Sequence, residues 1–299
     1  MISVCLCSLN LSPWNTRIRD GFYKALQKKP EFNVEITNDL PLKKNYDFLI
    51  LCGIKLIYKK KLNTKLLRQK VKFIVELGDD GMDPRKTDAD LYFFFNPSNE
   101  VYYKNYKYLP KFIETEYLFP EHDKKKTIYI DHYRHQTENE KKISQSSIQF
   151  IFQQLSPYKN YFNIYFHSEK GIEINPSQIS IPKNEKQNYK QIDYKEICKY
   201  YRKSHLFFPT HRETQGMLAQ EIGSCGGLTV MQDWMYPQTT HYQFNHEIYN
   251  FQTGINFDKL IKMCDEDDFI DNNRNHVIKH CSFNTFQEKL VYYLKELFL

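Results

Sequence analysis

The feature that most constrains the fold is an alternation of short apolar runs with segments of helical periodicity. In the first part of the chain, apolar runs predict strands at residues 2–7, 32–36, 47–52, 71–77 and 91–95. Apolar residues at helical spacing predict a helix at residues 14–26, between the first two strands. Strands separated by helical segments are typical of a parallel sheet covered on both faces.

The same alternation restarts after residues 109–120, which we interpret as a linker because Pro110 and Pro120 stand near its ends. Further strands are predicted at 126–131, 161–167, 206–209 and 228–231, and helices at 144–155, 194–203, 217–225, 257–264 and 283–297. The prediction is an α/β protein with two Rossmann-like, doubly wound domains facing a ligand cleft. We expect domains at residues 1–120 and 121–283, with a final helix at 284–299 packing back toward the first domain.

Charge and composition divide the chain in a similar way. Of its 299 residues, 42 are basic and 36 acidic, a net charge of +6. Residues 1–120 hold 20 of the basic and 14 of the acidic residues, so the remainder is neutral, and all ten histidines lie at or after His122. No apolar run is long enough to span a bilayer. Seven cysteines without CxxC spacing predict reduced thiols and a cytoplasmic protein.

The most informative window runs from Phe207 to Val230. A short apolar strand leads through Pro209 to a loop that ends at Glu213, and a predicted helix then carries Glu221. Seven residues separate the two glutamates, so about two helical turns lie between them. Four of the ten glycines in the chain occur here, at positions 216, 223, 226 and 227. Close approach of the backbone to a ligand would explain that concentration.

This window resembles the signature of GT-B glycosyltransferases of the family-four retaining type. The matching residues are Pro209-Thr210, Glu213, Glu221, Ser224-Cys225-Gly226 and Leu228-Thr229-Val230. Downstream, residues 254–257 and 282–286 match the family's Gly-hydrophobic run and its short aromatic segment. The resemblance covers about residues 125–299. It implies a GT-B fold, an acceptor-side first domain, and a second domain that binds a nucleotide-sugar.

The resemblance also implies individual roles. Glu213 would hold hydroxyls of the donor sugar, Glu221 would bind the nucleotide ribose, and the backbone at Thr214, Gln215, Gly216 and Met217 would lie against sugar and phosphate. The competing interpretation is structural: Glu213 caps a helix and Glu221 lies on a solvated helix face. No cofactor or essential metal is expected beyond a nucleotide-sugar co-substrate, UDP- or GDP-linked, with a UDP-sugar favoured.

The family places an Arg and a Lys after the first strand of the second domain to contact the diphosphate. Arg134 and Lys141, or Lys142, follow that strand here, although the spacing is long and the neighbouring sequence departs from the family pattern. Arg212 and Arg202 are the competing cations. His132 and His135 form a weak candidate for a metal pair, because no further ligands stand at a known spacing.

The largest departure from the family is the lack of a histidine in the first domain. Asp79 and Asp80 follow a predicted strand at the corresponding place, where either would orient the acceptor hydroxyl or stabilise an oxocarbenium-like state. The alternative is an ordinary turn before Gly81. Trp14, Arg17 and Arg19, at the start of the first helix, are candidate acceptor contacts.

Residues 55–72 carry eight basic residues and no acidic one. Such a stretch indicates a peripheral contact with an anionic membrane or nucleic acid, or a solvated face in a lysine-rich protein. The sequence therefore predicts a retaining, metal-independent hexosyltransferase that acts on a glycan, a lipid-linked or another anionic acceptor. The alternatives are a GT-B-like binding protein without catalysis and a viral-type DNA-modifying glycosyltransferase.

Overall fold

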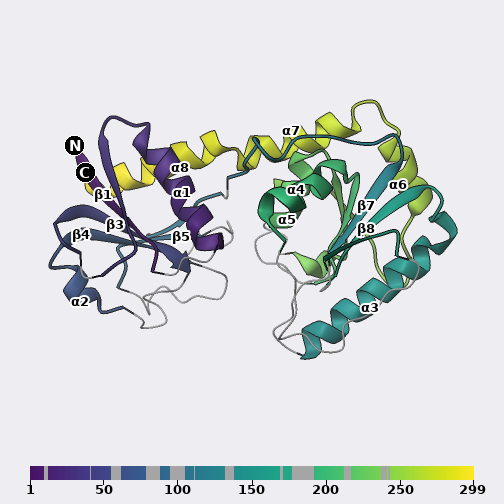
Figure 1. The fold of residues 1–299 in the computed structure, drawn as a ribbon, viewed down its shortest axis with the longest axis horizontal. Coiled ribbons are helices and arrows are strands. Elements are labelled where there is room, and N and C mark those ends of the chain that lie inside the picture. Colours follow the sequence, from purple (N-terminus) through teal and green to yellow (C-terminus); the bar gives the residue numbers. More distant parts are fainter. Residues whose placement is uncertain are drawn as a thin grey trace. The chain divides into compact units, whose positions relative to one another are not determined.

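The computed structural model describes residues 1–9, 13–40, 42–54, 62–78, 88–94, 105–110, 112–131, 138–168, 171–176, 192–211, 217–236, 241 and 243–299. The chain forms two compact units (Figure 1). The first consists of Met1–Phe112 together with Ser282–Leu299, and the second of Ile113–Cys281. The division therefore falls a few residues before position 120. The segment 109–120 is more than a linker, since Leu109 is buried in the first unit and Ile113 and Leu118 in the second.

The first unit contains a parallel six-stranded sheet in the order β2-β1-β3-β4-β5-β6. Its strands are β1 (Ile2–Cys7), β2 (Phe32–Thr37), β3 (Tyr46–Ile54), β4 (Val71–Leu77), β5 (Leu91–Phe94) and β6 (Tyr106–Tyr108). Its helices are α1 (Pro13–Gln27), α2 (Thr64–Leu67) and α8 (Phe283–Phe298). Near-continuous apolar runs such as Ile2–Cys7 suit a sheet buried on both faces.

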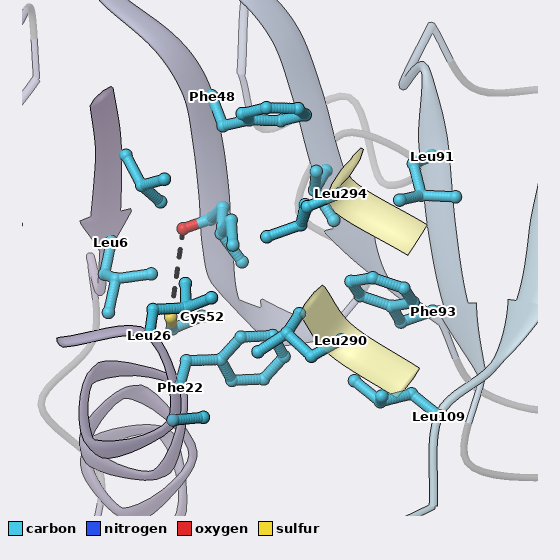
Figure 2. Packing of buried hydrophobic residues seen from close by; sticks show 14 of the residues in the cluster. Leu6, Phe22, Leu26, Phe48, Cys52, Leu91, Phe93, Leu109, Leu290 and Leu294 are labelled. Atoms are coloured by element: carbon cyan, nitrogen blue, oxygen red, sulfur yellow. Dashed lines mark hydrogen bonds between the residues drawn. The ribbon is translucent and has the colours of Figure 1, made fainter. Parts of the chain in front are cut away.

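One face of this sheet is covered by α1 and by the last helix of the chain (Figure 2). The rings of Phe22 on α1 and Phe286 on α8 meet edge to face at 5.3 Å. Leu290 and Leu294 of α8 are fully buried in the same cluster. Each such side chain contributes about 1.5–3 kcal/mol by its removal from water. The amphipathic face of α8 thus belongs to the core of the first unit.

The opposite face of the first sheet contains a buried glutamate. Glu76 on β4 is fully buried and accepts a hydrogen bond from the phenol of Tyr92 on β5. Burial also raises the pKa of the Cys5 thiol to about 12 and that of Cys7 to about 11, so both stay protonated. All seven cysteines are free.

The second unit contains a six-stranded sheet in the order β12-β11-β10-β7-β8-β9, parallel except for β9, which is antiparallel to β8. The strands are β7 (Lys126–Asp131), β8 (Phe162–Ser168), β9 (Gly171–Ile174), β10 (Leu206–Phe208), β11 (Leu228–Met231) and β12 (His246–Ile248). The helices are α3 (Glu138–Leu155), α4 (Tyr194–Lys203), α5 (Met217–Ser224), α6 (Phe257–Cys264) and α7 (Phe269–Cys281), with 3-10 turns at Ser156–Tyr158 and Asp233–Met235.

Several elements differ from the prediction. Strands β6, β9 and β12 and helix α2 have only three or four residues, too few to show a period. Helix α7 packs through Phe269, Asn273, Val277 and Cys281, but its Asn and His residues obscure its helical period in the sequence. Helix α3 begins at Glu138 rather than at 144, because its first two turns are polar. Among the described residues, no helix is both long and apolar enough to cross a membrane.

Candidate functional site

The loops that leave the carboxyl ends of β7 and β10 are tied together by buried hydroxyl groups. Thr210, directly after β10, donates a hydrogen bond to the backbone carbonyl of Asp131, the last residue of β7. Its hydroxyl also lies 2.9 Å from that of Ser144 on α3. Thr210 and Ser144 are fully buried. Thr210, part of the predicted motif, therefore holds the backbone at the end of β7 in a fixed position.

A second polar contact lies at the same edge, across the β7–β8 pair. Asp131 and His167 occupy opposite positions in the parallel register. The Nδ1 atom of His167 is 3.0 Å from Oδ1 of Asp131 and 2.9 Å from the phenolic oxygen of Tyr129. Asp131 is 5% and His167 8% exposed. Because a buried carboxylate is costly unless it is hydrogen-bonded, this partner fixes the Asp131 side chain beside the loop predicted to carry Arg134.

Glu221 lies in the middle of α5 and is buried, with 5% exposure. Its Oε1 accepts a hydrogen bond of 3.0 Å from the phenol of Tyr194, the first residue of α4. The interpretation that Glu221 lies on a solvated helix face is therefore wrong. The helix begins at Met217, as predicted, which places Glu221 one turn from the amino end.

A second phenol from α4 lies near the same carboxylate. Tyr201 is buried, and its ring packs edge-on against Tyr129 at 5.2 Å. Desolvation, followed by the charges of Glu221 and Asp131, raises the pKa of the Tyr201 phenol well above its ordinary value. The Tyr201 phenol is therefore neutral.

The glycines of the motif have packing explanations. A Cβ at Gly223 would lie 2.7 Å from Val277 Cγ2, and one at Gly226 2.5 Å from Ile270 Cγ2. Gly226 also has a φ of +91°, which favours glycine. A Cβ at Gly227 would lie 2.7 Å from the Ser204 carbonyl oxygen. Contact with neighbouring side chains and backbone, rather than with a ligand, accounts for these three glycines.

Many predicted site residues lie outside the described residues: Glu213, Thr214, Gln215, Gly216, Arg212, Arg134, His132, His135, Asp79 and Asp80. Trp14 and Lys141 belong to α1 and α3, but their side chains are not described. Met217 and Arg17 are partly buried, and Lys142 is exposed on α3.

Two of the candidate basic residues, Arg202 for the diphosphate and Arg19 for the acceptor, already have protein partners. The Arg202 Nε atom lies 2.9 Å from Glu121, and the guanidinium is 4.6 Å from the ring centre of Phe119. Arg19 pairs with the adjacent Asp20 at 2.9 Å. Neither contact involves Glu221 or Asp131.

Part of the basic stretch 55–72 is neutralised by carboxylates from outside it. Arg68 pairs with Asp90 at 3.1 Å, and Lys72 with Asp47 at 2.6 Å. Residues 55–61 lie outside the described part of the chain. The charge available to an anionic partner is thus smaller than the sequence count suggests.

Sequence reasoning missed Tyr194, Tyr201, Asp131 and His167. A usable signal was present for the tyrosines, because they stand seven residues apart, on one side of the predicted helix at 194–203. His167 stands at the end of a predicted strand, where functional side chains of parallel sheets gather. Within the described residues, no group of three or more His, Cys, Asp or Glu side chains is arranged to hold a metal ion.

A cavity of about 660 Å³ lies elsewhere in the second unit, between the amino ends of β11 and β12 and helices α6 and α7. Its described lining includes Asn245, His246, Asn273 and His276, but no Lys or Arg. Because its described lining offers no cation to pair with a diphosphate, we do not assign the nucleotide to this cavity. Glu221 and Asp131 are not part of it.

The fold is that of known nucleotide-sugar enzymes, although sequence comparison finds no match among family models or curated proteins. A glycosyltransferase involved in avilamycin A biosynthesis matches with a TM-score of 0.58 at 7% identity, over 99% of this chain and 98% of its own. The UDP-GlcNAc 2-epimerase from Neisseria meningitidis, bound to UDP-GlcNAc, matches with a TM-score of 0.55 at 10% identity, over 99% and 100%. The kitacinnamycin glycosyltransferase matches with 0.55 at 8%, over 98% and 99%. The predicted GT-B fold is thereby confirmed.

Proposed function

We propose that this chain is a nucleotide-sugar-dependent glycosyltransferase whose second unit binds the donor. The observation that carries the proposal is the buried carboxylate of Glu221, held by a phenol on the side of the sheet where the parallel strands end. A carboxylate accepts two hydroxyl donors at once, which suits the 2′- and 3′-hydroxyls of a ribose. In open α/β sheets, nucleotides bind beyond the carboxyl ends of the strands.

In the proposed reaction, Glu213 holds hydroxyls of the transferred hexose. The backbone amides of residues 214–217, at the amino end of α5, lie against the sugar and phosphates, where the helix dipole favours negative charge. Arg134 and Lys141 neutralise the diphosphate as the glycosidic bond breaks, with Lys142 and Arg212 as substitutes. Transfer would proceed with retention, and Asp79 or Asp80 would serve the acceptor hydroxyl.

The acceptor would bind the first unit through Trp14 and Arg17, and residues 55–72 would attract an anionic surface. A glycan or lipid-linked acceptor fits this placement. The pairing of Arg68 with Asp90 and of Lys72 with Asp47 reduces the charge available for a DNA acceptor. Strong salt dependence of transfer would restore the DNA hypothesis, because counterion release makes nucleic-acid binding steeply salt-sensitive.

Epimerisation of a nucleotide-sugar is the second candidate. It is favoured by the whole-chain match to the epimerase bound to UDP-GlcNAc, which covers 100% of that protein. The two reactions differ in their need for an acceptor. Incubation of UDP-GlcNAc with the protein alone, followed by NMR of the sugar, would reveal an epimer without any acceptor present.

The first test is a thermal-shift panel of UDP, GDP, UDP-glucose, UDP-GlcNAc and GDP-mannose. A ligand at about 100 times its Kd stabilises the protein by about 2.7 kcal/mol, so the matching nucleotide should raise the Tm. Glu221→Gln should remove the shift. Glu196→Gln, which changes an exposed carboxylate on α4 that pairs with Lys199, is the matched control. If no nucleotide stabilises the wild type, the proposed function is refuted.

The second test follows the reaction itself. Wild-type protein, the stabilising nucleotide-sugar and a panel of glycan and lipid-linked acceptors should release free nucleoside diphosphate only when an acceptor is present. The anomeric configuration of the product, read by NMR, decides between retention and inversion. Binding of nucleotide without transfer or epimerisation would support the non-catalytic alternative.

A further inference from the structure

Helix α4 presents two tyrosines to the interior of the second unit. Tyr194 and Tyr201 are seven residues apart, two helical turns, so they share the face that also buries Ile197 and Cys198. The Asp193 side chain caps the helix by accepting a hydrogen bond of 2.9 Å from the Lys195 amide. This cap fixes the start of the helix and therefore the place of Tyr194.

The two phenols lie near the same carboxylate. Tyr194 donates directly to Oε1 of Glu221 at 3.0 Å, and Tyr201 lies near enough for the charge of Glu221 to act on it. The ring of Tyr194 also meets that of Tyr117 edge to face at 6.4 Å, and Lys195 Nζ lies 5.1 Å from the centre of the Tyr117 ring. The Tyr194 side chain is thus held by packing as well as by its hydrogen bond.

We propose that Tyr194 is a positioning residue that sets the orientation of Glu221 for recognition of both hydroxyl groups of a nucleotide ribose. The proposal rests on the assignment of Glu221 to the ribose under the proposed function. A carboxylate on a glutamate side chain rotates about several bonds, and simultaneous contact with two neighbouring hydroxyls requires one orientation of its plane. The Tyr194 phenol, which is carried by a capped helix, lies 3.0 Å from Glu221 Oε1 and restricts that rotation.

The test separates ribose recognition from general weakening of the site. The Kd of UDP and of 2′,3′-dideoxy-UDP is measured by calorimetry, with GDP and its dideoxy analogue in parallel. The ratio of the two Kd values reports only the contribution of the ribose hydroxyls. The variants are Tyr194→Phe, Glu221→Ala and the control Tyr200→Phe, whose ring packs against Tyr165 at 5.2 Å on the same helix.

We expect wild type and Tyr200→Phe to favour the ribonucleotide over its dideoxy analogue, and Glu221→Ala to abolish the preference. Tyr194→Phe should reduce the preference by roughly tenfold or more while the Kd of the dideoxy analogue stays unchanged, since a hydrogen bond to a charged group is worth at least about that factor. The Tm of Tyr194→Phe should stay close to that of Tyr200→Phe.

Two results would overturn the proposal while leaving the proposed function intact. One is a Tyr194→Phe variant that keeps the full ribose preference. The other is a Tyr194→Phe variant that weakens ribonucleotide and dideoxynucleotide binding equally, which would give Tyr194 a purely structural role. A wild-type protein that shows no ribose preference, or a Glu221→Ala variant that keeps it, would instead refute the assignment of Glu221 and the positioning role with it.

Discussion

Lowering the pH from 7.5 to 5.0 should destabilise the second unit through His205. This imidazole is 6% exposed, and its Nδ1 accepts a hydrogen bond of 3.1 Å from the backbone N–H of Thr127. Burial, followed by the nearby His122 and Lys126, lowers the pKa of His205 from 6.5 to about 3, and weaker influences of a hydrogen bond to the Lys203 backbone and of Asp123 oppose them. The folded protein therefore keeps His205 neutral.

The magnitude follows from the difference in pKa between the folded and unfolded states. Between pH 6.5 and about 3 the unfolded chain binds a proton at His205 that the folded chain does not bind. The stability that depends on neutral His205 is thus fully present above pH 6.5 and declines as the pH falls toward 3. Each pH unit below 6.5 is worth about 1.4 kcal/mol, so the loss at pH 5.0 is about 2 kcal/mol.

The comparison variant is His205→Asn, because the amide oxygen of Asn can replace Nδ1 as the acceptor for the Thr127 N–H but cannot be protonated in this range. Both proteins carry Trp14→Phe, which leaves Trp234, in the second unit, as the reporter of that unit. Urea unfolding is followed by tryptophan fluorescence at pH 7.5 and 5.0. Between these pH values, the wild type should lose about 2 kcal/mol more than the variant.

His122, which is half-buried and has a pKa lowered mainly by burial, is present in both proteins. Because its ring centre lies 4.3 Å from that of His205, the comparison reports the titration of His205 together with its coupling to His122. Equal losses of unfolding free energy in the two proteins, within about 0.5 kcal/mol, would refute the reasoning. They would mean that the folded state takes up a proton at His205 as readily as the unfolded chain does, and that the contact to Thr127 is given up at little cost.

Three further predictions concern packing and the motif. Gly226→Ala should destabilise the second unit by about 1–3 kcal/mol in urea unfolding, because of the φ of +91° and the clash of the new Cβ with Ile270. An unchanged urea midpoint would mean that α7 shifts to accommodate the Cβ at no cost. Leu290→Ala should lower the free energy of unfolding of the first unit by about 2–5 kcal/mol, because Leu290 is buried in its core. Tyr292→Ala, at an exposed position of the same helix, should change it by less than about 0.5 kcal/mol. Similar effects of the two substitutions would contradict the packing of α8. Glu213→Ala should abolish glycosyl transfer with an unchanged circular dichroism spectrum, and full activity would remove Glu213 from the site.

The main elements were predictable because their periodicity is strong and local. The strands Ile2–Cys7, Val71–Leu77 and Lys126–Asp131 and the helix Phe257–Cys264 have the predicted bounds, since each is an apolar run or a clear helical face between polar boundaries. The short edge strands and α7 were missed. An edge strand of three residues such as His246–Ile248 owes its conformation to its neighbour in the sheet rather than to its own sequence.

The candidate site was predictable in part. The spacing in the motif indicated a helix beginning near Met217 with Glu221 on it, and the structure has that helix. Gly223 and Gly226 were misread as signs of a ligand, because their neighbours Val277 and Ile270 on α7 are distant in sequence. Gly216 lies outside the described residues. The sequence alone does not show which neighbouring atoms would clash with a Cβ at a glycine position.

The sequence by itself determined the two α/β halves, the approximate position of their division, and the helix that carries Glu221, because each depends on local periodicity and turn residues. Only the tertiary structure decided that Glu221 is buried and bonded to Tyr194, and that Asp131 is paired with His167. Burial and side-chain pairing depend on which distant segments pack together. The number of residues between two positions does not measure their distance in space.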